Sequence, residues 1–286
     1  MPTPTVSALT MPVLVLASLL AFAANSVLCR LALAPGLIDP VSFTTLRIAS
    51  GAVVLLGVLV LRGAFNVPDF RPASSFALFL YAIAFSVAYV TLPAASGALL
   101  LFGSVQITMI GAGLIKGERP SIQTWLGILL AVGGLVWLLA PGVQAVPLLP
   151  AGAMMLSGMA WACYSLLGAR RGDPVLATAW NFVGAVPFAC AASLMARSQF
   201  HVTAEGALWA VISGGLTSGL GYVVWYRVLP ALPTTTAAAL QVSVPVLAAL
   251  AGVLLLGEPL APRLVLAGVV VLGGIALVVR ARARGG

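Results

Sequence analysis

"GLIKGERPS" occupies residues 113–121 of the chain and "VLLLGEPLA" occupies residues 253–261, so a glycine–glutamate pair close to a proline occurs twice. The two glutamates, Glu118 and Glu258, are 140 positions apart. Each pair lies between two long apolar stretches, at the same place in the pattern. Similarity at a fixed separation indicates that the chain contains two copies of one structural unit.

Two further pairs of stretches support this duplication. "LGILLAVGGLV" at 126–136 and "LAGVVVLGGIA" at 266–276 follow the two glutamates with the same separation of 140 positions. "DPVSFTTL" at 39–46 and "DPVLATAW" at 173–180 are separated by 134 positions, and each opens an apolar stretch. Because the pairs occur in one order along the chain, we predict a first repeat and a second repeat of similar length.

The composition indicates an integral membrane protein. Of 286 residues, 62% are hydrophobic and 7% are charged, whereas about a quarter of the residues of a soluble protein are charged. A helix needs roughly 17–25 apolar residues to cross a bilayer, and such stretches recur along the chain. We predict an all-α membrane protein with ten transmembrane helices, near 12–33, 40–62, 72–91, 95–115, 121–140, 148–168, 174–196, 206–227, 234–256 and 262–280.

The distribution of positive charge predicts the orientation. With the N-terminus in the cytoplasm, the outer gaps carry three arginines, Arg30, Arg197 and Arg263. The cytoplasmic segments then carry ten cationic residues, namely Arg62, Arg71, Lys116, Arg119, Arg170, Arg171, Arg227, Arg280, Arg282 and Arg284. Cationic residues are enriched on the cytoplasmic side of membrane proteins, so we expect both termini to be cytoplasmic.

Five helices per repeat have a consequence for topology. Because five is an odd number, the second copy enters the membrane upside down relative to the first, as in the inverted repeats of many transporters. We therefore predict an inverted pair of repeats over 1–140 and 148–280, followed by a basic cytoplasmic tail over 281–286. The first span has no basic leader and no cleavage site, so we expect it to be retained as a helix.

Several other classes of protein fit the sequence less well. The net charge of +8 comes without a basic cluster interleaved with aromatic residues, so we expect no nucleic-acid partner. Cys29, Cys163 and Cys190 lie within apolar spans, which favours core residues over a disulfide or a metal site. The spans lack the paired aspartates or serine–base pair of an intramembrane enzyme. A channel is the remaining alternative, although its filter is usually built on the symmetry of several chains. We expect neither enzymatic activity nor a cofactor.

The ordered motifs resemble those of a known family. Ten helices in two copies, "DPVSFTTLRIA" at the second helix, and "GERP" or "GEPL" before a helix with two glycines resemble the EamA-type members of the drug/metabolite transporter superfamily. Within it the chain is most similar to bacterial amino-acid exporters, including those for aromatic amino acids. The resemblance implies a multi-pass protein of the bacterial inner membrane that exports a small solute by alternating access. It also implies that the fifth and tenth helices are peripheral. We expect a monomer or a weak dimer. The fourth helix departs from the family pattern. It has Gln106 at a place where many relatives have proline, whereas the ninth helix has a proline there, Pro245.

The acidic residues are expected to serve structure. Asp39 and Asp173 precede proline at helix starts, and Glu118 and Glu258 precede proline at turns, so we expect all four to cap the helices that follow them. None of the six acidic residues lies in the middle third of a span; they are Asp39, Asp69, Glu118, Asp173, Glu205 and Glu258. Proton-coupled carriers usually need an intramembrane acid or histidine, and the single histidine, His201, falls in an outer loop. We therefore favour facilitated or exchange transport, with proton-coupled drug or metabolite efflux as the alternative.

The candidate substrate-binding residues are aromatic side chains and neutral amides near the span centres. The set is Asn25, Tyr81, Phe85, Tyr89, Gln106, Trp161, Tyr164 and Gln241. Rings and neutral amides suit a neutral or zwitterionic solute, and buried amides need partners that a cavity supplies. Plain helix packing, helix–helix hydrogen bonds by the amides, and an interfacial position for Tyr89 are the alternatives.

Three further features concern motion and the membrane interface. Pro93, Pro187 and Pro245 are candidate hinges, since proline bends helices. We expect Trp225 and the adjacent Tyr226 to lie in an interfacial aromatic belt. Arg47 lies about 10 Å inside the second helix, and we expect it to snorkel outward, or else to meet a carboxylate.

Overall fold

The computed structural model describes residues 10–64, 71–115, 117, 121–140, 146–168, 173–232 and 240–285. These residues are almost entirely helical. The helices are α1 (Met11–Leu33), α2 (Pro40–Leu61), α3 (Pro72–Tyr89), α4 (Ala94–Ile115), α5 (Ile122–Leu139), α6 (Leu148–Gly168), α7 (Pro174–Met195), α8 (Ala204–Ile212), α9 (Gly221–Val228), α11 (Val244–Leu256) and α12 (Pro262–Gly285). A π-helical segment, η2 (Ser213–Leu220), joins α8 to α9.

Eight helices within the described residues are long and apolar enough to cross a membrane. Two of the ten predicted spans are not among them. The span predicted over 148–168 forms α6, with 21 residues, and the span predicted over 234–256 is described from residue 240 onward, where α11 has 13 residues. The basic residues predicted as a tail continue α12 as far as Gly285.

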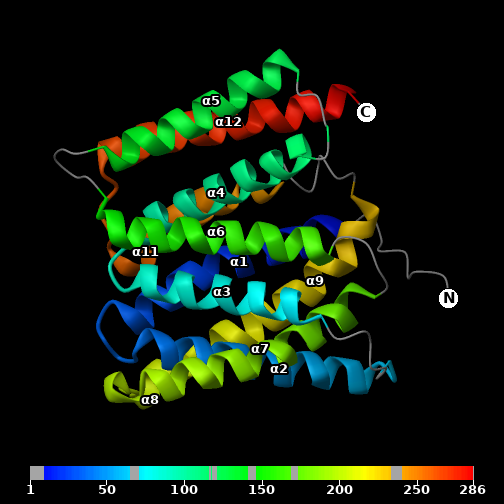
Figure 1. Cartoon of the computed structure of the whole chain (residues 1–286), viewed down its shortest axis with the longest axis vertical. Helices are drawn as coiled ribbons and strands as arrows, with labels where there is room; N and C mark the ends of the chain where they lie inside the picture. The colour runs from blue at the N-terminus through cyan, green and yellow to red at the C-terminus, as the bar shows by residue number, and fades with distance from the viewer. Residues whose placement is uncertain are drawn as a thin grey trace.

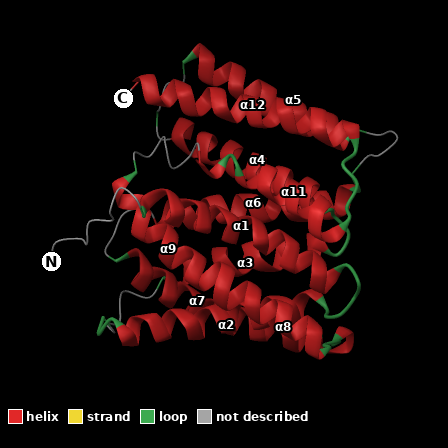
Figure 2. Ribbon diagram, turned by 180° about the vertical axis from the view of Figure 1, so that it is seen from behind, coloured by secondary structure: helices red, strands yellow, loops and turns green. Residues whose placement is uncertain are grey.

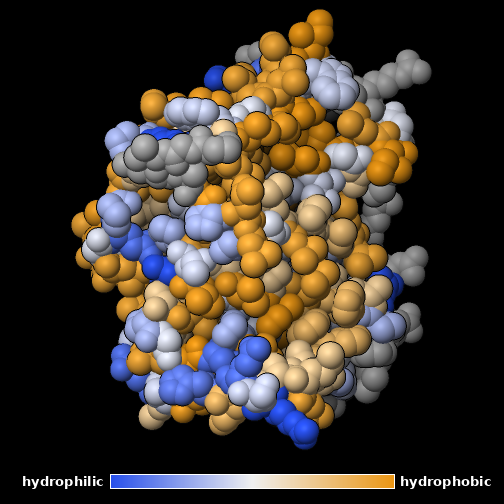
Figure 3. All heavy atoms as spheres, turned by 60° about the vertical axis from the view of Figure 1, so that its left-hand side comes forward, coloured by the Kyte–Doolittle hydropathy of each residue, from blue (hydrophilic) through white to orange (hydrophobic). Residues whose placement is uncertain are grey.

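The surface of the helix bundle is apolar. Val53, Leu129 and Leu254 expose 65–79% of their surface, and orange, hydrophobic residues cover much of the face seen in Figure 3, with hydrophilic residues in a few patches. An apolar surface of this extent is unfavourable in water and favourable against lipid tails. The chain is therefore a membrane protein with several spanning helices.

The helices lie side by side in one bundle, and α1 begins at the same end at which α12 finishes (Figure 1). The most extensive contacts between helices have counterparts: if both helices of a pair are replaced by the matching helices of the other half, the resulting pair is also in contact. α3 packs on α6 as α8 and α9 pack on α1, and α4 packs on α6 as α11 packs on α1. α2 packs on α7, and α5 packs on α12.

The pair α5 and α12 forms one edge of the bundle (Figure 2). Glycines let the two backbones touch, because a Cβ on Gly127 would lie 2.5 Å from the carbonyl oxygen of Gly274. A Cβ on Gly134 would lie 2.7 Å from a methyl carbon of Val271. The peripheral position agrees with what the family resemblance implies for the fifth and tenth helices.

The span predicted as one α-helix over 206–227 is irregular. It runs continuously over Ala204–Val228, but its central part, η2, is π-helical, a conformation that is often found at functional sites. Gly214 in η2 lies against α2, where a Cβ would overlap the carbonyl oxygen of Arg47 and the hydroxyl of Ser50. A glycine is therefore needed for η2 to pack against α2.

Asp39 and Asp173 are the N-caps of α2 and α7. Oδ1 of Asp39 accepts hydrogen bonds from the amides of Val41 and Ser42, and its Oδ2 accepts one from the amide of His201 in the loop before α8. Oδ1 of Asp173 accepts from the amide of Val175. These bonds satisfy amides at the start of each helix that have no intrahelical partner.

Glu258 differs from the expectation that it caps the helix that follows it. Its Oε2 accepts a hydrogen bond from the amide of Ala94, at the start of α4 in the other half, at 2.7 Å. Its Oε1 accepts from Nε of Arg30. The reason is the packing of α11 against α4, which brings the turn after α11 to the N-terminus of α4. Glu118, the matching residue of the first half, lies outside the described residues.

Candidate solute-binding site

A cavity of about 40 Å³ lies in the middle of the bundle. Its walls come from both halves of the chain, and the lining residues are Phe22, Asn25, Ser26, Tyr81, Phe85, Leu101, Phe102, Trp161, Tyr222 and Gln241. This volume holds a few water molecules. A larger solute therefore requires the side chains or helices around the cavity to move apart.

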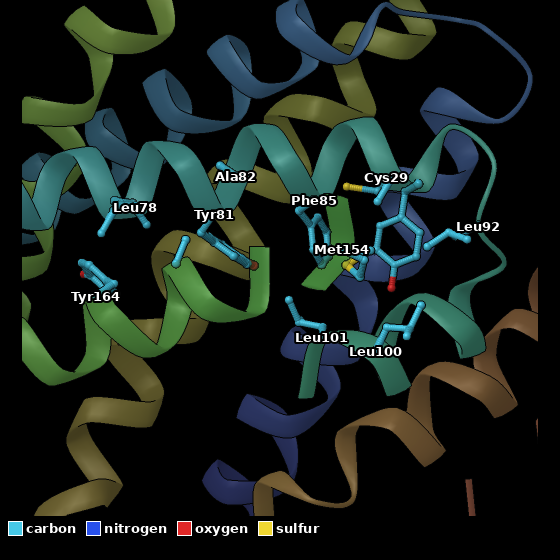
Figure 4. Close-up of a cluster of buried hydrophobic side chains, with 14 of the residues drawn as sticks. Cys29, Leu78, Tyr81, Ala82, Phe85, Leu92, Leu100, Leu101, Met154 and Tyr164 are labelled. Atoms are coloured by element: carbon cyan, nitrogen blue, oxygen red, sulfur yellow. The ribbon is translucent and has the colours of Figure 1, made fainter. Parts of the chain in front are cut away.

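Aromatic rings form the larger part of the cavity wall. The ring centroids of Tyr81 and Trp161 are 4.8 Å apart, and those of Trp161 and Tyr222 are 5.5 Å apart. Phe85 lies one turn after Tyr81 on α3, with a centroid separation of 5.5 Å. Figure 4 shows Tyr81 and Phe85 projecting from α3 on the side where Leu101 lies. Contacts of this geometry stabilise the aromatic part of the wall.

The polar part of the lining is neutral. Oδ1 of Asn25 accepts hydrogen bonds from the hydroxyls of Ser213 at 2.9 Å and Thr217 at 2.6 Å, and a longer one from Ser218 at 3.4 Å. All three hydroxyls come from the π-helical segment η2, which therefore fixes the orientation of the Asn25 amide. Gln241, half-buried just before α11, supplies a second amide to the lining.

Five of the eight predicted substrate-binding residues lie together in this lining: Asn25, Tyr81, Phe85, Trp161 and Gln241. Tyr89 is fully buried behind the wall, where its hydroxyl donates to Ser26 at 2.8 Å and its ring packs edge-on against Phe85. Tyr164 packs against Trp161 without lining the cavity. Gln106 is half-buried in α4 and is also absent from the lining.

The sequence prediction omitted five lining residues: Phe22, Ser26, Leu101, Phe102 and Tyr222. Phe22 and Ser26 lie three residues before and one after Asn25, so they share its helix face or border it, and that spacing could have identified them. Trp225 does not lie in an interfacial belt, because it is buried with its ring 5.8 Å from that of Phe22.

The three candidate hinge prolines occupy different environments. Pro187 lies inside α7, where it removes one backbone hydrogen bond of the helix. Pro93 immediately precedes α4, and Pro245 lies in the first turn of α11, buried next to the cavity-lining segment.

Arg47 does not snorkel outward, and no carboxylate that the structure describes pairs with it. Its side chain on α2 is buried, with 2% of its surface exposed. Nη2 donates to the hydroxyl of Tyr81 at 3.0 Å and Nε donates to the hydroxyl of Ser218 at 3.3 Å. The guanidinium also lies 5.3 Å and 5.1 Å from the ring centroids of Tyr81 and Phe85. These neutral partners hold the cation inward, a position that its distance along the helix did not indicate.

The geometry defines a class of protein: a multi-pass membrane protein whose helices surround a small central cavity that both halves line, as in a solute transporter. The model of the EamA-like transporter family matches residues 9–140 and, a second time, residues 148–280. The chain therefore belongs to the EamA-like transporter family, within the drug/metabolite transporter superfamily.

Individual relatives agree with this family. The uncharacterized protein PA1977 of Pseudomonas aeruginosa is 53% identical over 268 residues, which are 93% of each chain. The threonine/homoserine exporter RhtA of Escherichia coli K12 is 32% identical over 169 residues, and RhtA of Salmonella typhimurium LT2 is 30% identical over 159 residues. The matches to RhtA span only about half of either chain, 52–55%.

A crystal structure of a protein that is 18% identical superposes with a TM-score of 0.66, covering 95% of this chain and 98% of the other. At this identity the likeness concerns the fold alone. With bacterial relatives and several apolar helices, the chain is a multi-pass protein of the inner membrane.

Proposed function

We propose that the chain exports amino acids, aromatic and other neutral ones, through the central cavity by alternating access. The observation that carries the proposal is the lining itself: ring faces and two neutral amides, contributed by both halves, with no acidic residue among the described residues of the wall. Ring faces hold apolar and aromatic side chains, and amides hydrogen-bond a zwitterion without fixing a charge. The similarity of half of the chain to exporters named for threonine and homoserine points in the same direction.

The proposed mechanism rests on two inverted five-helix repeats, over 1–140 and 148–280, with ten spans and both termini in the cytoplasm. The exchange of helix contacts between the halves supports this symmetry. In such carriers one conformation converts into its inverted counterpart, which opens the site to the other side of the membrane. Pro93, Pro187 and Pro245 are the proposed hinges, and the unit is a monomer or a weak dimer.

We propose facilitated or exchange transport as the energetic mode. The four acidic residues that the structure describes lie at or just outside helix ends or in the first turn of a helix: Asp39, Asp173, Glu205 and Glu258. A carrier that translocates protons needs a titratable group exposed to the cavity in turn from each side. Proton-coupled efflux of drugs or metabolites is the alternative that the experiment below separates.

The test is counterflow in proteoliposomes that contain the purified chain. We expect saturable uptake of labelled L-phenylalanine or L-threonine, accelerated by unlabelled amino acid inside and persisting when an ionophore collapses the pH gradient. Efflux of organic cations without any amino-acid counterflow would contradict the proposed substrate. Uptake abolished by the ionophore would establish proton coupling instead.

Substitutions in the lining test the assigned site within the same assay. Trp161→Ala removes a ring that contacts Tyr81 and Tyr222, so we expect the half-saturating phenylalanine concentration to rise about tenfold. Trp125→Ala on the lipid-exposed face of α5 is the matched control. Gln241→Ala should also impair transport, with Gln199→Ala, an exposed position, as its control. Wild-type kinetics in both cavity variants would show that solutes bind elsewhere.

A further inference from the structure

We propose that Arg47 recognises the carboxylate of the transported solute, and that the rings of Tyr81 and Phe85 separate this cation from the cavity until the solute binds. The inference rests on the proposed transport of amino acids and identifies the group that distinguishes them from uncharged or amidated compounds. Nη1 of Arg47 is buried without a hydrogen bond.

A buried guanidinium is strongly stabilised by an anionic partner, because burial removes it from water. Removing a cation from water carries a large desolvation cost, and each unpaired donor adds its own. The two bonds that Arg47 makes, to the hydroxyls of Tyr81 and Ser218, supply partial charges only. The site therefore stabilises the cation incompletely.

No acidic side chain that the structure describes provides the missing charge. Glu258 pairs with Arg30, and Asp173 lies 3.9 Å from Arg62. Asp39 accepts hydrogen bonds from two backbone amides at the start of α2 and from the amide of His201, and Glu205 accepts a hydrogen bond from Trp209. Arg47 is thus a buried cation whose neighbours on α3 and η2 are neutral.

The position of Arg47 connects it to the cavity. Tyr81 and Phe85 line the cavity, and the guanidinium lies against the same two rings, about 5 Å from each centroid. One layer of side chains therefore separates the cation from a bound solute. A change in the rotamer of Tyr81 would release Nη2 and open a path to Nη1 as well.

The chemistry of the exposed group would then match a carboxylate. The two terminal nitrogens of a guanidinium form two parallel hydrogen bonds with the two oxygens of a carboxylate, which an amide or an alcohol cannot reproduce. The number of hydrogen bonds that the guanidinium makes rises on binding, because Nη1 has none beforehand. The ring of an aromatic solute would remain among Trp161, Tyr222 and Phe22 in the cavity.

The experiment compares L-phenylalanine with L-phenylalaninamide as inhibitors of phenylalanine counterflow into proteoliposomes, at about pH 6, where both amino groups carry a proton. The two compounds share their ring and ammonium group and differ in the carboxylate. For the wild type we expect the amide to inhibit about 10–100-fold more weakly. Arg47→Gln should lose this preference, so that both compounds inhibit weakly and equally. Arg47→Lys keeps the charge without the planar fork and should retain part of the preference.

Arg62→Gln, an exposed arginine just after the same helix, is the matched control and should keep the full preference. Size-exclusion chromatography and thermal unfolding show whether each variant folds. If the wild type transports phenylalanine but does not distinguish it from the amide, the role of Arg47 is wrong while the proposed function stands. A folded Arg47→Gln variant that keeps the preference would likewise show that the role of Arg47 is wrong. If Arg47→Gln does not fold, the preference of the wild type for phenylalanine over its amide and the partial preference expected of Arg47→Lys still test the role of Arg47. Absence of any amino-acid transport by the wild type would overturn the proposed function itself.

Discussion

Nε of Arg30 donates a hydrogen bond to Oε1 of Glu258 at 2.7 Å, and this ion pair joins α1 of the first half to the turn after α11 of the second. The other oxygen of the carboxylate holds the amide of Ala94 at the start of α4. Nη1 of Arg30 donates to the carbonyl of Tyr89 at the end of α3. One acidic side chain thus ties several helix ends together at a single end of the bundle.

Glu258→Gln tests this connection. The substitution keeps the shape of the side chain but leaves Arg30 without a charged partner in a place where both side chains are mostly buried. We expect the free energy of unfolding to fall by about 1.5–3 kcal/mol, the usual contribution of a hydrogen bond to a charged group. Thermal unfolding in detergent measures it. Asp173→Asn is the control, because its pair with Arg62 is exposed and exposed pairs contribute little. Equal losses in both variants would contradict the structural role of Glu258.

Asp39 makes the stability of the fold depend on pH. Partial burial acts to raise the pKa of Asp39, but hydrogen bonds from Ser42, His201 and Val41 outweigh it, so the pKa is below its usual value. A carboxyl whose folded pKa is depressed stabilises the fold above its unfolded pKa of about 4 and loses that contribution as the pH falls through the folded value. At pH values below about 4, we expect the midpoint temperature of thermal unfolding to decrease more steeply with falling pH in the wild type than in Asp39→Asn. Parallel pH profiles would count against this assignment.

The sequence predicted what depends on local patterns. Asp39 and Asp173 could be placed at helix starts because a cap and a following proline are adjacent in the chain. Asn25, Tyr81 and Trp161 could be placed in a common cavity because they lie near span centres. The environment of Arg47 could not be predicted, since it depends on η2, more than 160 positions away in sequence. The partner of Glu258 is equally remote, because Ala94 belongs to the other half.

The hydroxyls of η2 are predicted to position Asn25 for transport. Thr217→Val keeps the side-chain shape and removes the hydroxyl that donates to Oδ1 of Asn25 at 2.6 Å. We expect weaker solute binding with little loss of stability, since such hydrogen bonds contribute about 0.6 kcal/mol on average in membrane proteins. The half-saturating concentration in counterflow should rise about threefold. Thr108→Val, which removes a hydroxyl that donates to the carbonyl of Ser104 in its own helix, should leave transport unchanged. If the half-saturating concentration rose equally in Thr108→Val, the effect of Thr217→Val could not be attributed to Asn25.

Gly214 provides the test of how η2 packs against α2. A Cβ at this position would overlap the backbone oxygen of Arg47, and a backbone atom cannot rotate away as a flexible side chain can. We expect Gly214→Ala to destabilise the fold by about 1–3 kcal/mol, the cost of overpacking, and to impair transport because Arg47 and the η2 hydroxyls shift together. Gly57→Ala on the exposed face of α2 is the control, because nothing lies within 4 Å of its Cβ position. That variant should be stabilised slightly by the better helix propensity of alanine. Thermal unfolding and phenylalanine counterflow measured on the two variants decide the matter, and a Gly214→Ala protein as stable and active as Gly57→Ala would show that the close approach of η2 to α2 is not required.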